Sequence, residues 1–272
     1  MTLLEVIATT VADARAAQRG GANRLELVTA MGEGGLTPSI GLIEAVTEAV
    51  DIPVNVIVRP HSRSFVYDAD DYAVMLRDVR AIAKTRANAI VVGMLTANGD
   101  IDTDGLARVI DAADGLPLTF HRAFDDTRDL HAAFDTLLQF DAVTNVLTSG
   151  GKPSVLEAEK TIAKLVERAK DSHCTVLAGA GLTVDAVAPF VASTRARAVH
   201  FGSGVRVDGN GLAPGMKRES GACGRRSTRW AEAGAYAPIH GSLRKHHPAT
   251  VFRCPSPSLS PSNPSSRSYA CP

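Results

Sequence analysis

The sequence predicts an α/β protein of the (β/α)8 barrel type, with its eighth helix missing. Eight short apolar runs alternate with seven helical stretches at intervals of about 20–30 residues, which is typical of strand–helix units repeated around a barrel. The runs are apolar throughout, as expected for strands covered on both faces. A doubly wound sheet would show the same alternation, so periodicity leaves both folds open. The count of eight favours the barrel.

The first half of the predicted barrel contains four strand–helix units. Gly20 and Gly21 end the first helix, because glycine tolerates the left-handed backbone of a helix C-terminus. Thr37 or Ser39 can cap the second helix after a glycine-rich loop, and apolar residues recur with a 3.6-residue period in the third. We expect strands at 3–8, 24–28, 54–58 and 89–92, and helices at 11–19, 40–50, 69–86 and 103–113.

The fifth strand is expected within residues 118–125, where a short apolar run after Pro117 ends in His121, Arg122 and Asp125. A buried strand that ends in charged groups is how a parallel α/β protein presents chemistry, although an ion pair beside a core histidine would look the same. The remaining strands are expected at 145–148, 175–178 and 198–201, and the helices at 128–139, 154–170 and 183–193.

The barrel pattern stops after Gly209, which divides the chain into a barrel domain (1–209) and a low-complexity tail rich in Ser, Pro and Arg (210–272). The first part has 20 basic and 27 acidic residues, and the second has 9 basic and 2 acidic residues. The tail holds eight of the chain's fourteen prolines and too few apolar residues to offset the entropy of ordering. It is either disordered or translated from a shifted reading frame; the abrupt change favours the second explanation.

Composition excludes several classes of function. The formal net charge is zero, which gives no global reason to expect nucleic acid or an anionic membrane as a partner. No apolar run reaches the roughly 20 residues that span a bilayer, and the start of the chain does not read as a signal peptide. The four cysteines form neither a disulfide framework nor a zinc pattern. We therefore expect a cytoplasmic protein.

Polar residues at the predicted strand ends form a candidate site. Charges inside a barrel are costly unless they are paired, so these groups should pair with one another or with a ligand. Histidines and carboxylates can transfer protons, and arginines bind anionic groups. The candidate catalytic residues are Glu5, Glu26, His121, Arg122, Asp125 and His200, and Arg59 and Ser149 are candidate substrate-binding residues.

Two glycine-rich turns add a possible anion site. Gly179, Gly181, Gly202 and Ser203 follow the seventh and eighth strands, where many barrels hold a phosphate with backbone N–H groups. Tight strand–helix turns would need glycine equally. Glu5, Glu26, His121 and His200 could bind a borderline divalent ion, but no closely spaced His/Cys motif supports a metal site. Copper(I) prefers sulfur ligands, and the strand ends offer none.

Several motifs together resemble those of the copper homeostasis protein CutC family, over about residues 3–205. They are Leu4-Glu5, GANRLEL at 21–27, EGGLTPS at 33–39, Arg59-Pro60, TFHRAFD at 119–125, LTSG at 147–150, AGAG at 178–181 and Val199-His200. The resemblance implies a (β/α)8 barrel, a cytoplasmic homodimer or higher homo-oligomer, and a role in copper homeostasis. Family members proposed to bind copper(I) carry cysteines at the ends of the first two strands. The corresponding stretches here, residues 6–8 and 27–29, contain no sulfur.

Two hypotheses of function follow. The resemblance implies a metal-homeostasis protein, with copper as the only cofactor it suggests. The residues themselves favour a TIM-barrel enzyme or sensor for a small anionic or phosphorylated metabolite bound at the C-terminal mouth of the barrel. In that hypothesis His121 acts as a general acid or base, Arg59 and Arg122 hold anionic groups, and Glu5 or Glu26 orients or deprotonates the ligand.

Overall fold

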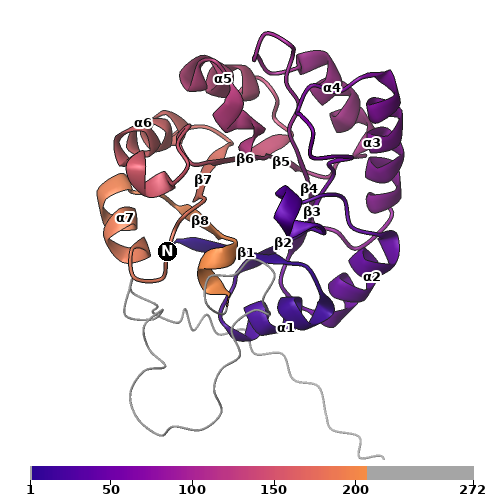
Figure 1. Cartoon of the computed structure of the whole chain (residues 1–272), viewed down its shortest axis with the longest axis horizontal. Coiled ribbons are helices and arrows are strands. Elements are labelled where there is room, and N and C mark those ends of the chain that lie inside the picture. The colour runs from indigo at the N-terminus through magenta and orange to yellow at the C-terminus, as the bar shows by residue number, and fades with distance from the viewer. Residues whose placement is uncertain (1, 207–272) are drawn as a thin grey trace, which may run out of the picture. The chain divides into compact units, whose positions relative to one another are not determined.

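The computed structural model describes residues 2–206, which form a closed barrel of eight parallel strands. Each strand pairs with the next in sequence, and β8 closes the ring on β1 with Leu3 opposite Ala198. Figure 1 looks down this ring. The predicted fold class is confirmed. The strands are β1 (Leu3–Ala8), β2 (Arg24–Leu27), β3 (Val54–Ile57), β4 (Ala89–Val92), β5 (Leu118–Phe120), β6 (Val143–Thr148), β7 (Thr175–Gly179) and β8 (Ala198–Phe201).

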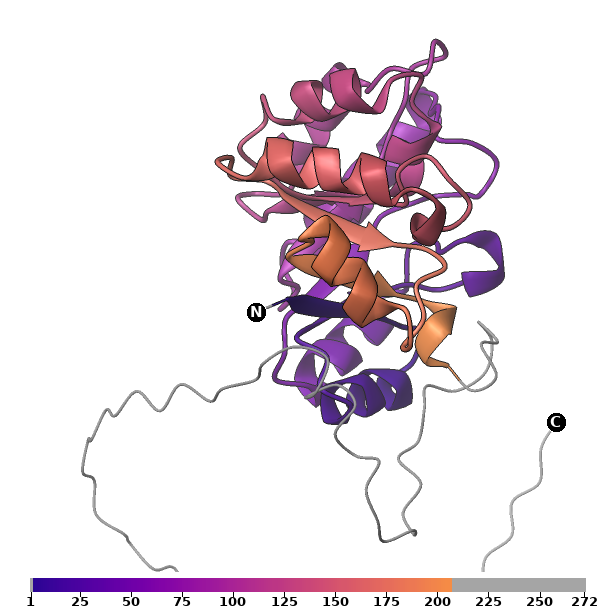
Figure 2. The ribbon, with the colours of Figure 1, turned by 90° about the vertical axis from the view of Figure 1, so that its left-hand side faces the viewer.

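Seven α-helices surround the strands within residues 2–206, and Figure 2 shows α6 and α7 side by side on the outside of the barrel. Five of them begin at a side chain that accepts a hydrogen bond from a backbone N–H of the first turn, at Thr10, Ser39, Asp68, Asp102 and Asp129. The helices are α1 (Val11–Arg19), α2 (Ile40–Ala49), α3 (Ala69–Ile82), α4 (Thr103–Ala112), α5 (Leu130–Leu137), α6 (Glu159–Ala169) and α7 (Val187–Thr194).

Several predicted elements are shorter than expected, and three of them have a local cause. Strand β5 has three residues, because the His121 side chain accepts the N–H of Ala123 and turns the chain into a 3-10 helix over Arg122–Asp126. The helix expected at 154–170 divides into a 3-10 helix (Val155–Glu157) and α6. Residues 183–186 form a turn in which Thr183 accepts the N–H of Ala186, so α7 starts at Val187.

The barrel interior is partly polar. Val28, Ile57 and Val91 form one apolar cluster, which packs with Ile7 and Met31 on the side of the strand C-termini. Leu147, Leu177 and Ala198 form another with Leu3. Because side chains alternate along a strand, the same inward-facing rows also carry the half-buried Asn145 and five buried polar residues, namely Glu5, Arg24, Glu26, Asn55 and His200.

The described chain ends just after β8. A 3-10 helix over Ser203–Val205 follows the strand, and the guanidinium of Arg206 pairs with Asp13 of α1 at 3.2 Å. The predicted loss of the eighth helix and the predicted tail fall outside the described residues. Within residues 2–206, none of the helices has both the length and the apolar character that a membrane span requires.

Candidate functional site

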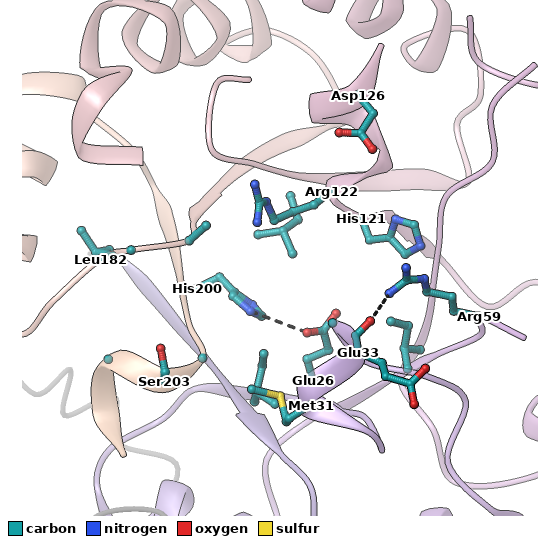
Figure 3. Close-up of a pocket in the computed structure, with 18 of the residues that line it drawn as sticks. Glu26, Met31, Glu33, Arg59, His121, Arg122, Asp126, Leu182, His200 and Ser203 are labelled. Atoms are coloured by element: carbon teal, nitrogen blue, oxygen red, sulfur yellow. Dashed lines mark hydrogen bonds and ion pairs between the residues drawn. The ribbon is translucent and has the colours of Figure 1, made fainter. Parts of the chain in front are cut away.

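A cavity of about 500 Å³ opens at the carboxyl ends of the strands. Figure 3 shows that its wall combines acidic, basic and apolar side chains from several strands. Eight of the twelve predicted site residues line it, namely Glu26, Arg59, His121, Arg122, Gly181, His200, Gly202 and Ser203. The other four, Glu5, Asp125, Ser149 and Gly179, lie behind the wall. The sequence analysis missed Met31, Glu33, Phe65, Asp126 and Leu182, which also line the cavity.

At the floor of the cavity an imidazole lies between two carboxylates, of which Glu26 lines the cavity and Glu5 lies behind it. His200 Nδ1 lies 2.8 Å from Glu5 Oε1, and His200 Nε2 lies 3.6 Å from Glu26 Oε2. All three side chains are almost fully buried. Figure 3 shows the ring of His200 facing the Glu26 carboxylate. The arrangement fixes the ring through Glu5 and presents Glu26 to the cavity.

Glu5 is held in its charged form by neighbours that the sequence analysis did not identify. Arg24 Nε donates to Glu5 Oε2, and Asn55 Nδ2 lies 3.4 Å from the same oxygen. The strand register places Arg24 beside Glu5, because the two residues lie opposite each other in the β1–β2 pair. Its position two residues before Glu26 was the available signal, since residues two apart in a strand share a face.

Burial and neighbouring charges separate the two carboxyl groups. Burial acts to raise the pKa of Glu5, but the hydrogen bond with His200 and the charge of Arg24 outweigh it, so this pKa is lowered. Burial raises the pKa of Glu26 to about 7, against the opposing charge of His200. For His200, burial acts to lower the pKa, but Glu26 and Glu5 outweigh it and the pKa is raised. Glu26 and His200 can therefore exchange a proton near neutral pH.

His121 is held as a neutral imidazole. Its Nδ1 accepts the backbone N–H of Ala123 at 3.1 Å, which leaves the ring hydrogen on Nε2. Burial, together with the charge of Arg59, lowers the pKa of His121 to about 3. The predicted role as a general acid or base does not fit a ring that binds protons only in strong acid. Among residues 2–206, Nε2 is buried without a hydrogen-bond partner.

Two glycines make room for the two histidine rings. A Cβ on Gly93, just after β4, would lie 2.3 Å from His121 Nδ1. A Cβ on Gly179, at the end of β7, would lie 2.9 Å from the Cβ of His200. Real side chains do not approach so closely, so both rings occupy space that only glycine leaves open. Gly179, predicted as an anion ligand, thus lies against His200 behind the cavity wall.

Arg122 is the cation most open to the cavity. Its Nε donates to Asp125 Oδ2 at 2.9 Å, and its Nη2 donates to Ser149 Oγ at 3.0 Å. The side chain is 43% exposed, and Figure 3 shows it extending over the cavity. Asp125 is occupied as well, because it accepts the backbone N–H groups of Ser149 and Gly151. From behind the wall, Asp125 and Ser149 therefore hold the Arg122 guanidinium in place.

Arg59 is largely committed to the protein itself. Its Nη1 donates to the carbonyls of Glu33 and Gly35, and its Nη2 lies 3.4 Å from the carbonyl of Ser62. Its guanidinium also stacks on Phe65. The predicted anion-binding role is left to Nε, which has no partner among residues 2–206. Arg59 thus mainly fixes the two loops that form one side of the mouth.

The glycine-rich turns contribute backbone to the wall. Gly181, Gly202 and Ser203 line the cavity, but Gly181 also has a packing reason, because a Cβ there would lie 2.5 Å from Ser154 Oγ. Residues 182–186 lie between Gly181 and the start of α7 and separate this turn from the helix N-terminus. Gly202 has more room, with Ile7 Cδ1 3.3 Å from the position of a Cβ.

The donor atoms do not form a metal site within the described part of the chain. No cluster of three or more His, Cys, Asp or Glu side chains there could hold an ion. Cys174, at the start of β7, is buried beside the opposite end of the barrel. The cavity wall does contain one thioether, Met31, which the sequence analysis overlooked. A single thioether does not make a copper(I) site.

Comparison with known proteins gives a consistent assignment. The sequence profile described as the CutC family matches residues 2–205. A family protein CutC of Salmonella enteritidis is 38% identical over 205 residues, which cover 75% of this chain and 81% of the relative. One of Xanthomonas campestris pv. campestris is 40% identical over 201 residues, which cover 72% and 81%.

Solved structures agree with the barrel. A Streptococcus agalactiae protein described as a copper homeostasis protein, CutC, superposes with a TM-score of 0.70 at 30% identity and covers 74% of this chain and 98% of its own. Phosphoribosyl anthranilate isomerase from Thermococcus kodakaraensis superposes with a TM-score of 0.51 at 16% identity, over 77% of this chain and 92% of its own. The second similarity shows the shared fold alone.

Proposed function

The chain belongs to the CutC family, and from that premise we propose that it is an enzyme acting by acid–base chemistry on a small anionic metabolite. The observation that carries the proposal is the placing of Glu26 and His200 in the wall of the cavity, 3.6 Å apart. Strongly shifted pKa values of buried groups in a cleft cluster at functional sites, where neighbouring charges and burial set them. A cavity of about 500 Å³ is within the usual range for small-molecule sites.

Arg122 supports an anionic ligand. Two of its three nitrogens are held by Asp125 and Ser149, so the guanidinium is oriented before a ligand arrives. A preorganised guanidinium loses less freedom on binding a carboxylate or phosphate, which favours affinity. The acidic side chains of Glu33 and Asp126 also border the cavity. They repel anions, so they disfavour a ligand whose negative charge lies away from Arg122.

Copper homeostasis is the role that the name of the Streptococcus agalactiae protein gives, and direct copper binding does not fit this cavity. Its wall offers one thioether, from Met31, and His200 already lies between two carboxylates. We expect titration with copper(I) under a competing chelator to give the same affinity for the full chain and for Met31→Leu. A marked loss of affinity in Met31→Leu would instead place copper in the cavity.

Thermal unfolding with a library of small carboxylates and phosphates tests the proposal. A ligand present at 100 times its Kd stabilises a protein by about 2.7 kcal/mol, which corresponds to a rise in Tm of roughly 5–11 °C for a barrel of this size. Arg122→Ala should abolish the shift for the same ligands. Arg128→Ala is the matched control, because Arg128 is exposed and pairs with Asp100.

The outcome decides between a ligand site and a structural arrangement. Stabilisation of the wild type and of Arg128→Ala, with none for Arg122→Ala, supports the proposal. Equal stabilisation of all three proteins would place the ligand elsewhere, and no stabilisation by any anion would refute the proposed function.

A further inference from the structure

Resting on the proposed function, we propose that the site moves a proton on a carbon next to a carbonyl group. The substrate class is a short carbonyl compound with a carboxylate or phosphate. Glu26 removes the proton, the Nε2–H of His121 binds the carbonyl oxygen, and Arg122 holds the anionic group. All three residues line the same cavity, and Figure 3 shows them on different sides of it.

His121 supplies the donor for the oxygen. Its Nδ1 is occupied by the N–H of Ala123, so Nε2 must carry the hydrogen. This N–H is buried and has no acceptor among residues 2–206, and the His121 side chain lines the cavity. A buried donor without an acceptor costs about 1–3 kcal/mol. A ligand oxygen in the cavity would recover that loss.

The neutrality of His121 favours a carbonyl over a group that needs protonation. With a pKa of about 3, the ring cannot act as an acid that is replenished at neutral pH. It can, however, donate a hydrogen bond that strengthens as negative charge develops on an oxygen. A neutral imidazole paired with a carboxylate base is a known arrangement for proton abstraction next to a carbonyl.

Glu26 provides the base on another side of the cavity. Its carboxylate faces the open space, and His200 is its ion-pair partner among the described residues. His200 is itself fixed through Nδ1 by Glu5, so its Nε2 stays directed at Glu26. The pair can take up a proton, hold it while the intermediate exists and return one to the reacting carbon.

The chemical step balances without another reactant. The C–H bond breaks and its proton passes to a Glu26 oxygen, while the electron pair forms a C=C bond. The carbonyl π electrons move onto the oxygen, where the His121 Nε2–H stabilises the charge. While the intermediate is bound, the carboxyl proton of Glu26 exchanges with solvent. Glu26 then returns a proton to the same carbon, and the carbonyl reforms. In D2O the product is the substrate with deuterium at that carbon.

Solvent-deuterium exchange is the test. The probes are dihydroxyacetone phosphate and 2-oxobutanoate, with glycerol 3-phosphate and 2-hydroxybutanoate as matched anions without a carbonyl. Library carbonyl compounds that stabilise the protein join the panel. Loss of the C–H signal is followed by proton NMR in D2O with the full chain, against a protein-free sample.

The variants separate the base from the binding site. We expect Glu26→Gln to slow exchange by at least about 100-fold while the ligand-induced shift in Tm persists, because general-base catalysis contributes about 10²–10⁴-fold. His121→Asn should also slow exchange. Glu44→Gln, an exposed position on α2, should exchange like the wild type.

The outcomes distinguish the two proposals. A carbonyl anion that binds through Arg122 but shows no exchange above the protein-free rate overturns this inference and leaves the proposed function standing. The same holds if only anions without a carbonyl bind, or if exchange is equal in Glu26→Gln and wild type. Absence of any anion binding overturns both.

Discussion

Gly93→Ala tests whether the His121 ring is held in a space that only glycine leaves open. A Cβ at this position would lie 2.3 Å from His121 Nδ1, 2.4 Å from its Cε1 and 2.8 Å from the Cβ of Ala123. The ring cannot simply turn aside, because Nδ1 accepts the Ala123 N–H and Phe65 packs at a centroid distance of 5.1 Å. The added methyl group must therefore shift the ring or the backbone.

The size of the effect follows from these contacts. Overpacking a buried site costs typically 1–3 kcal/mol, and loss of the Ala123 hydrogen bond adds about 1 kcal/mol. A total of about 2–4 kcal/mol lowers Tm by roughly 4–16 °C for a domain of this size. Gly41→Ala is the control, because a Cβ at this position of α2 meets nothing within 4 Å. This change should stabilise the protein by about 0.5–1 kcal/mol.

The assay is thermal and urea unfolding of wild type, Gly93→Ala, Gly41→Ala, His121→Ala and the double variant of Gly93 and His121. Both glycine changes reduce the freedom of the unfolded chain similarly, so their difference reports the folded state. Gly93→Ala should lower the free energy of unfolding by less in the His121→Ala background than in the wild type. If Gly93→Ala is as stable as Gly41→Ala, or costs the same in both backgrounds, the steric reasoning is wrong.

Three further predictions concern charge. His121→Asn should gain stability relative to wild type as pH falls from 6.5 toward 3, because the wild-type unfolded chain binds a proton there that the folded ring, with its pKa of about 3, refuses. Glu26→Gln should gain stability relative to wild type as pH rises from 4.5 to 7, because in this range the wild-type Glu26 keeps its proton in the folded state and loses it in the unfolded state. Both predictions are checked by urea unfolding at several pH values, and a difference in unfolding free energy between variant and wild type that does not change with pH would contradict them. Asp125→Asn should lower the free energy of unfolding by about 1.5–3 kcal/mol, whereas Asp126→Asn should stay within about 0.5 kcal/mol, and equal losses would refute the anchoring role of Asp125.

Most of the barrel could be predicted because its causes are local. Each strand is a short apolar run, and five of the helices begin at a capping side chain, so hydrophobicity and local hydrogen bonding locate them. The predicted end of β5 was too late, because the strand stops where the His121 side chain accepts a hydrogen bond from the backbone N–H of Ala123. That contact competes with the strand ladder, and apolar periodicity carries no trace of it.

The site was predictable in outline only. Strand ends identified Glu26, His121, Arg122 and His200, because parallel strands bring their carboxyl ends to one mouth. Neighbours that depend on exact packing were missed. Gly93 reads as a simple turn residue until its distance to the His121 ring is known.

Adjacent acidic residues show the same limit. Asp125 and Asp126 are identical in sequence terms, yet the first turns inward to the N–H groups of Ser149 and Gly151, and the second lines the cavity. The 3-10 helix over Arg122–Asp126 decides which is which. The sequence predicts a catalytic role for Asp125, as it does for Glu5 and Glu26, whereas the structure places Asp125 behind the wall.

The proposed chemistry depends above all on a proton that Glu26 and His200 can exchange near neutral pH. The most direct measurement is a carbon-13 NMR titration of the glutamate side-chain carboxyls in the full chain, with Glu26→Gln identifying the Glu26 signal. We predict a midpoint near 7 for Glu26, well above the ordinary value of 4.5. A midpoint near 4.5, as for an exposed glutamate, would contradict the acid–base function proposed for this cavity.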